Sequence, residues 1–105
     1  MTLADHMTEA QWQKRVTDYA ALRHLRVWHD NDSRRNDAGL PDLLIVGPGG
    51  VAWLELKSAK GRVRREQAEW LADLRAAGQH AHVYRPEDWS DVKALLDALA
   101  GRGAA

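Results

Sequence analysis

Two short apolar segments separated by a glycine- and proline-rich stretch constrain this 105-residue chain most strongly. Residues 42–46 and 51–57 are rich in Leu, Val, Ile and Trp and have the length of β-strands. Gly47-Pro48-Gly49-Gly50, which lies between them, is typical of a tight turn. The sequence therefore predicts a β-hairpin.

The position of the turn also predicts the register of this hairpin. If the turn is centred on its two middle residues, facing residue numbers sum to 97, so Val46 faces Val51 and Asp42 faces Glu55. Directly opposed residues have Cβ atoms about 4.5–5.5 Å apart, and like charges at that spacing repel each other. A slip of one residue would separate the two acids.

A divalent cation bound between the two carboxylates would offset their repulsion, because Mg²⁺ is commonly held by one or two carboxylates and water. Lys57 shares the strand face of Glu55 and would lie near a water or phosphate oxygen held by that cation. The plain alternative is a hairpin whose polar residues face water.

The remaining elements are predicted from apolar spacing, caps and breakers. Helices are expected over 8–24, 63–77 and 87–100, with strands at 25–29 and around 80–84 and a polar loop at 30–39. Thr8 and Gln11 have the spacing of a capping box at the first helix. The order α-β-β-β-α-β-α predicts one α/β domain over residues 1–105, with residues 101–105 as a frayed tail.

Composition excludes several classes of protein. The 15 Lys and Arg balance the 15 Asp and Glu, which argues against a polycationic binder. The chain has no cysteine, so disulfide scaffolds and thiolate metal sites are excluded. No apolar run approaches the roughly 20 residues of a membrane span, and the first residues lack the features of a signal peptide. A cytoplasmic protein that does not bind membranes is expected.

Three segments resemble the PD-(D/E)xK nuclease superfamily, and within it the virus-type replication-repair nuclease (VRR-NUC) domain. They are Gly39-Leu40-Pro41-Asp42, Glu55-Leu56-Lys57 and Gln67-Ala68-Glu69-Trp70-Leu71, and the resemblance extends from about Glu9 to Val83. It implies a restriction-endonuclease-like α-β-β-β-α-β core, with a mixed central sheet flanked by helices, to which this chain adds a C-terminal helix. It also implies a nuclease that depends on Mg²⁺ or Mn²⁺.

The resemblance implies roles for individual residues. The metal ligands would be Asp42, Glu55, the backbone carbonyl of Leu56, and Glu9 on the first helix. Lys57 would orient or activate the attacking water, and Gln67 would support the site. Asp42, Glu55, Lys57 and Gln67 are thus the expected catalytic residues.

Basic residues cluster next to this expected site. Lys60, Arg62, Arg64 and Arg65 follow Lys57 within nine residues, and Arg34 and Arg35 lie in the loop before the hairpin. Such clusters contact DNA phosphates, although an ordinary solvated loop has the same composition. Trp53 shares the Glu55 face and is the tryptophan expected to contact DNA, whereas Trp12, Trp70 and Trp89 are expected in the core.

Taken together, these features predict a metal-dependent, structure-selective DNA endonuclease of the stand-alone phage or bacterial type. Its expected substrates are branched DNAs such as Holliday junctions or flaps in replication and repair. Cutting a symmetric junction needs two sites, so a homodimer is expected, and a helicase or replication protein is a possible partner. A non-catalytic nucleic-acid-binding module using the same basic loop, and a structural or dimerisation domain, are the alternatives.

Overall fold

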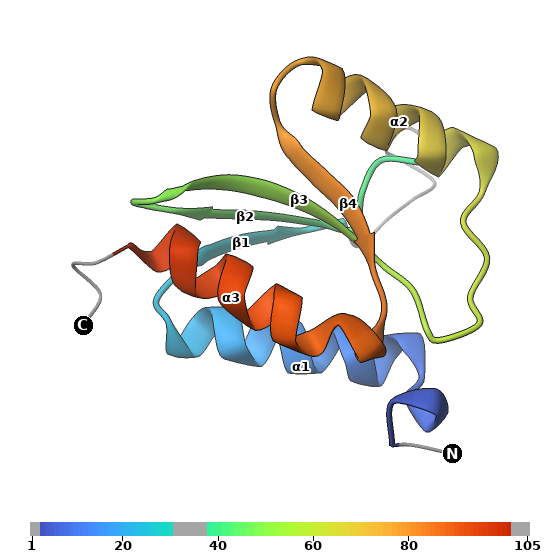
Figure 1. Ribbon diagram of the computed structural model, residues 1–105, viewed down its shortest axis with the longest axis horizontal. Helices are drawn as coiled ribbons and strands as arrows, with labels where there is room; N and C mark the ends of the chain where they lie inside the picture. Colours follow the sequence, from blue (N-terminus) through green and yellow to red (C-terminus); the bar gives the residue numbers. More distant parts are fainter. Residues whose placement is uncertain (1–2, 31–37, 102–105) are drawn as a thin grey trace.

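A four-stranded mixed sheet forms the centre of the protein. The computed structural model describes residues 3–30 and 38–101 (Figure 1). The strands, in spatial order, are β1 (Arg26–His29), β2 (Leu43–Gly47), β3 (Gly50–Leu56) and β4 (His80–Tyr84). The first two pairings are antiparallel and the pairing of β3 with β4 is parallel. The expected α/β fold with a mixed sheet is confirmed.

Helices cover both faces of this sheet. The described residues contain α1 (Glu9–Leu22), α2 (Arg65–Ala76), α3 (Trp89–Ala100) and two short 3-10 turns, η1 (Leu3–His6) and η2 (Pro86–Asp88). Figure 1 shows α1 and α3 together on one face, and α2 on the other side, at the β4 end. No helix in this part of the chain is both long enough and apolar enough to cross a membrane.

Local hydrogen bonds explain where the helices begin. In the predicted capping box of α1, the Gln11 N–H donates to Thr8 Oγ1 at 3.0 Å and the Thr8 N–H donates to Gln11 Oε1 at 2.9 Å. The last helix starts later than the expected residue 87, because Pro86 opens a 3-10 turn in which the Arg85 N–H donates to Asp88 at 2.8 Å. The expected tail beyond residue 101 lies outside the described residues.

One apolar core lies between the sheet and the α1–α3 pair. Its buried members include Trp12, Val16, Leu43, Ile45, Ala52, Leu54, Leu56, Val92, Leu96 and Leu99. The Trp89 ring meets Trp12 edge-on at 6.1 Å between centroids, so these two tryptophans pack in the core as predicted. The Trp12 indole N–H also donates to the Tyr84 carbonyl at 2.9 Å, which ties α1 to the end of β4.

The hairpin has the predicted register. Val46 pairs with Val51 and Leu44 with Trp53, so facing numbers sum to 97. The turn packs tightly against the end of α3, where the Gly49 N–H donates to the Leu99 carbonyl at 2.8 Å. A Cβ atom on Gly49 would collide with the Ala98 carbonyl oxygen, so glycine is required there for the close approach.

We therefore expect Gly49→Ala to destabilise the fold by about 2 kcal/mol or more in urea unfolding, because either the turn or α3 must move. Gly78→Ala is the matched control. Gly78 has a positive φ of 88°, but a Cβ atom added to it would meet no other atom within 4 Å, so this variant should lose only about 1 kcal/mol through backbone strain. Equal losses in the two variants would contradict the packing explanation.

Candidate active site

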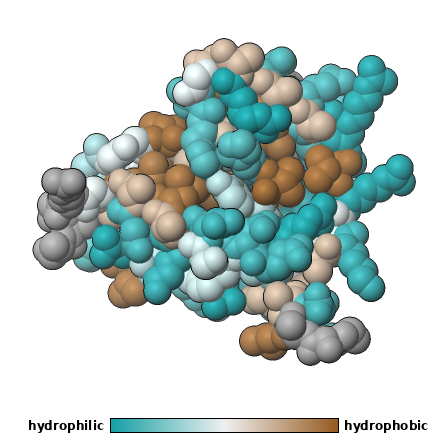
Figure 2. All heavy atoms as spheres, viewed as in Figure 1, coloured by the Kyte–Doolittle hydropathy of each residue, from teal (hydrophilic) through white to brown (hydrophobic). Residues whose placement is uncertain are grey.

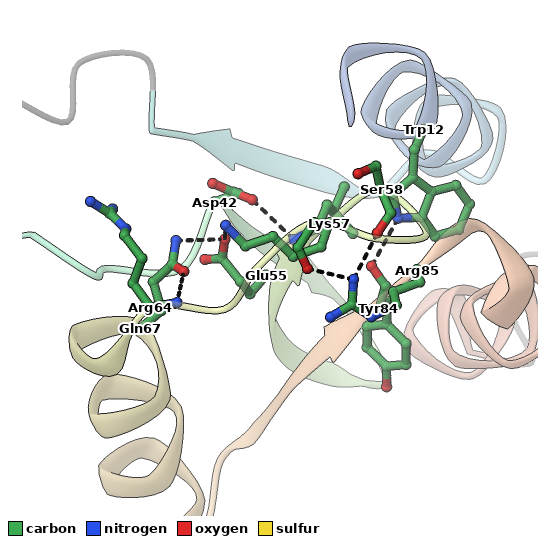
Figure 3. Close-up of polar contacts among 11 residues, drawn as sticks. Trp12, Asp42, Glu55, Lys57, Ser58, Arg64, Gln67, Tyr84 and Arg85 are labelled. Atoms are coloured by element: carbon green, nitrogen blue, oxygen red, sulfur yellow. Dashed lines mark hydrogen bonds and ion pairs between the residues drawn. The ribbon is translucent and has the colours of Figure 1, made fainter. Parts of the chain in front are cut away.

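The two carboxylates predicted to face each other do so at the open end of the hairpin. The ladder ends at Leu43 and Leu54, and the same register carried one step further places Asp42 opposite Glu55. Asp42 Oδ2 accepts the Leu56 backbone N–H at 2.9 Å (Figure 3). The carboxylate of Asp42 thus takes the place of a ladder partner where β2 has ended.

Glu55 is buried among polar groups, with a relative exposure of 1%. Its Oε2 accepts from Gln67 Nε2 at 3.1 Å and lies 3.4 Å from Lys57 Nζ. Its other oxygen, Oε1, is buried and has no hydrogen-bond partner among the described residues. An unpartnered buried carboxylate oxygen is costly, so this atom requires a proton or a bound ligand.

Gln67 connects Glu55 to the start of α2. Its side-chain carbonyl accepts the Arg64 backbone N–H at 2.8 Å, while its amide nitrogen donates to Glu55. These two bonds fix the amide orientation, as Figure 3 shows. The polar residue expected on the inner stripe of this helix therefore caps α2 and contacts the carboxylate pair at once.

The pKa of Glu55 is raised from its ordinary value of 4.5 to about 8, chiefly by burial. The negative charge of Asp42, and the hydrogen bond that a protonated Glu55 makes with it, contribute to this rise, and the ammonium of Lys57 acts in the opposite direction. At neutral pH the pair therefore needs either a proton or a cation. A divalent ion would replace that proton and allow both carboxylates to ionise.

A cleft of about 360 Å³ opens over this pair between the first turns of α1 and α2. Its lining is mostly polar and comprises Glu9, Gln13, His29, Asp30, Gly39, Leu40, Asp42, Glu55, Lys57, Arg64 and Gln67. Every catalytic residue predicted from the sequence is in this lining. Glu9 also reaches the cleft, from the first turn of α1.

The donors present fit a hard cation such as Mg²⁺ or Mn²⁺, which prefers oxygen ligands. Asp42 and Glu55 supply carboxylates, including the unpartnered Oε1. Across residues 3–30 and 38–101, however, no three Asp, Glu or His side chains converge as a metal cluster. Glu9 thus borders the cleft without completing a three-carboxylate cluster, and water would fill the remaining coordination positions of a bound ion.

The predicted backbone ligand is also suitably placed. The Lys57 N–H donates toward β4, to the Tyr84 carbonyl at 3.1 Å, so the polar groups of Leu56 point the other way, toward Asp42. The hairpin register places Pro41 opposite Leu56. Proline has no N–H, so it cannot donate to the Leu56 carbonyl as a continuing ladder would.

The predicted DNA-binding cations are only partly gathered at the cleft. Arg64 lines it, whereas Lys60, Arg62 and Arg65 are on the exposed segment that follows β3 or at the start of α2. Arg65 is paired with Glu69 at 2.9 Å on the helix surface. Arg34 and Arg35 lie outside the described residues.

Two further polar residues at the cleft, Gln13 and Asp30, were not predicted from the sequence as site residues. Gln13 and His29 are hydrogen-bonded to each other, and the Asp30 N–H donates to the Asp42 carbonyl at 3.0 Å. The strand register places Asp30 beside Asp42. The partner of β1 was unknown from sequence, because an irregular loop separates it from β2, so this juxtaposition left no local signal.

Arg85 also escaped prediction. Its guanidinium donates to the carbonyls of Ser58 and Gly61, both at 2.7 Å. It therefore fixes the loop that follows Lys57, as Figure 3 shows for the bond to Ser58. A contact between residues this far apart in sequence has no periodicity that would reveal it.

Comparison with known protein families gives a match over most of the chain. The model of the VRR-NUC domain family matches residues 3–87 of the 105 residues. No curated protein and no solved structure matches the chain. The matched range includes all four strands and every residue of the cleft.

The raised pKa of Glu55 predicts how stability depends on pH in EDTA. The folded state holds this proton more tightly than the unfolded state, so Glu55 should make the free energy of unfolding fall as pH rises from 4.5 to about 8. Glu55→Gln, which mimics the protonated acid, should gain stability over the wild type as pH rises. Urea unfolding at pH 5.5 and pH 8.5 tests this, and an unchanged difference between the two proteins would contradict it.

Proposed function

The chain belongs to the VRR-NUC domain family, a nuclease-type domain, and on this premise we propose that it is a DNA endonuclease that depends on Mg²⁺ or Mn²⁺. The observation that carries the proposal is the facing pair of half-buried Asp42 and buried Glu55, in which Glu55 Oε1 has no partner and Oε2 lies beside the Lys57 ammonium. Burial of a carboxylate next to a second carboxylate is unfavourable unless a cation or proton accompanies them.

In this proposal, Asp42, Glu55 and the Leu56 carbonyl hold the metal ion, with Glu9 contributing from α1 through the cleft. When bound, the ion would polarise the scissile phosphate and lower the pKa of a coordinated water. The Gln67 amide keeps Glu55 in place through its bond to Oε2. The Leu56 N–H does the same for Asp42.

Lys57 supplies the positive charge on the substrate side of the pair. Its exposure is only 9%, and its ammonium lies 3.4 Å from Glu55 Oε2. A fixed ammonium at this position orients the attacking water and stabilises the charge that develops on the phosphate. The bonds from Arg85 to the following loop support its placement.

Arg64 at the cleft, together with Lys60, Arg62, Arg65 and the loop arginines Arg34 and Arg35, would contact the DNA backbone. The proposed substrates are branched DNAs, such as Holliday junctions or flaps. A homodimer would bring two sites to a symmetric junction, and a helicase or replication protein would be a suitable partner. A non-catalytic binding module would use the same cations, but it offers no reason to place Asp42 opposite the buried Glu55.

A panel of labelled duplex, flap, splayed-arm and four-way-junction DNAs tests the activity. The wild type should cleave branched DNA with Mg²⁺ or Mn²⁺ and not in EDTA. Glu55→Gln and Lys57→Ala should each lose about 100-fold or more in rate, since each removes a group that acts in the transition state.

Lys14→Ala and Asp18→Asn are matched controls for this experiment. The two side chains are exposed and paired with each other at 2.7 Å, and neither lines the cleft. Both variants should retain the wild-type rate. Salt-sensitive DNA binding without cleavage under any metal would instead support the non-catalytic module.

Metal binding can be measured separately from cleavage. Isothermal titration with Mn²⁺ should show binding to the wild type, and Asp42→Asn or Glu55→Gln should weaken it at least about tenfold, because each removes one carboxylate donor. The affinity for Mn²⁺ should rise from pH 6 to pH 8, since the ion competes with the Glu55 proton. Equal affinity in wild type and Glu55→Gln would exclude Glu55 as a ligand.

A further inference from the structure

The face of the sheet that carries Asp42 and Glu55 also carries a partly exposed row of apolar side chains. Trp28 pairs with Leu44, and Leu44 pairs with Trp53, so these three side chains lie side by side across β1, β2 and β3. Figure 1 shows α2 over the β4 side of this face, and the α1–α3 pair lies on the opposite face. Trp28 is 41% exposed and Trp53 is half-buried. Figure 2, in which tryptophan is a pale residue on the hydropathy scale, shows more strongly hydrophobic residues at the surface beside α2.

This row adjoins the carboxylate pair directly. Trp53 is two residues before Glu55 on the same strand face, about 7 Å along β3. Trp28 is likewise two residues before Asp30, which lines the cleft. A ligand bound over Trp28 and Trp53 would therefore lie next to a ligand bound in the cleft.

A positively charged side chain lies next to this row. Arg26 lies two residues before Trp28 on the same face of β1 and is exposed. The surface thus combines two aromatic side chains, about 10 Å apart across two strand spacings, with a guanidinium at its outer border. Exposed aromatic side chains interleaved with cations are the features that bind single-stranded nucleic acid.

We propose that Trp28, Trp53 and Arg26 form a stacking platform for unpaired nucleotides next to the bond that is cut. The proposal rests on the nuclease function proposed above and adds a basis for its choice of substrate. An unpaired base can lie flat on an indole, whereas a base inside a duplex has both faces stacked already. The platform would therefore favour flaps and splayed arms over plain duplex, with little dependence on sequence.

The composition of the surface favours DNA over a second protein chain as its occupant. The apolar surface continues to Val46 and Val51, but it is bordered by Arg26 on β1 and by the substrate cleft at its other end. The positive charge of Arg26 complements a phosphate backbone. A partner chain seated on Trp53 would stand beside Glu55, where the substrate must enter.

Fluorescence anisotropy with labelled DNA in EDTA tests the platform without cleavage. Trp28→Ala should weaken binding of a single-stranded oligonucleotide and of a flap by about 5- to 50-fold, and binding of a blunt duplex by less than about twofold. Trp28→Phe should retain most of the affinity. Arg26→Ala should weaken binding and lower its salt dependence.

Val51→Ala is the matched control, because Val51 is 40% exposed on the same face, beside Val46, but carries no ring. It should bind every DNA as the wild type does. Single-stranded DNA should also quench the intrinsic tryptophan fluorescence of the wild type, and Trp28→Phe should show less quenching.

Three outcomes would overturn the platform. They are unchanged single-strand binding in Trp28→Ala, an equal loss for duplex and single strand, and a change in subunit assembly by light scattering with DNA binding intact. The last would assign the face to a second copy of the chain. Selective loss of single-strand binding in a protein that never cleaves would support the platform and contradict the nuclease function.

Discussion

The electrostatic repulsion between Asp42 and Glu55 is the constraint on which the rest of the site depends. The hairpin register brings the two acids together, and the burial of Glu55 removes much of the water that would screen them. Three donors offset this repulsion by contacting the carboxylates, namely the Leu56 N–H, the Gln67 amide and the Lys57 ammonium. These donors leave Glu55 Oε1 unpartnered, so the arrangement is complete only with a proton or a cation.

Gln67 links the first turn of α2 to the carboxylate pair. Its side-chain amide is hydrogen-bonded to both the Arg64 backbone and Glu55, so a movement of Arg64 would shift Glu55, and the reverse. Because Arg64 also lines the cleft, phosphate contacts and cation binding would act on the same short chain of bonds. Coupling of this kind is reciprocal, so each ligand would alter the affinity for the other by the same factor.

Much of the fold and the centre of the site could be predicted because they depend on local patterns. The Gly-Pro-Gly-Gly turn determines which residues of the hairpin face each other, and the Thr8–Gln11 spacing determines where α1 begins. Contacts between residues far apart in the chain are not marked by any local sequence pattern. Asp30 reaches the cleft only because β1 pairs with β2, and Arg85 holds the loop after Lys57 from the far end of β4. The placement of exposed Trp28 and half-buried Trp53 on one face of the sheet depends on the same strand order.

The Tyr84 carbonyl has a consequence for the dynamics of the site. This single oxygen accepts both the Trp12 indole N–H and the Lys57 backbone N–H, and so joins α1, β3 and β4 at one point. Trp12 is fully buried in the core. Local fraying cannot free the Lys57 amide while that core stands, so its hydrogen exchange should be governed by opening of the whole domain. The backbone of the lysine that lines the cleft is thereby tied directly to the buried core.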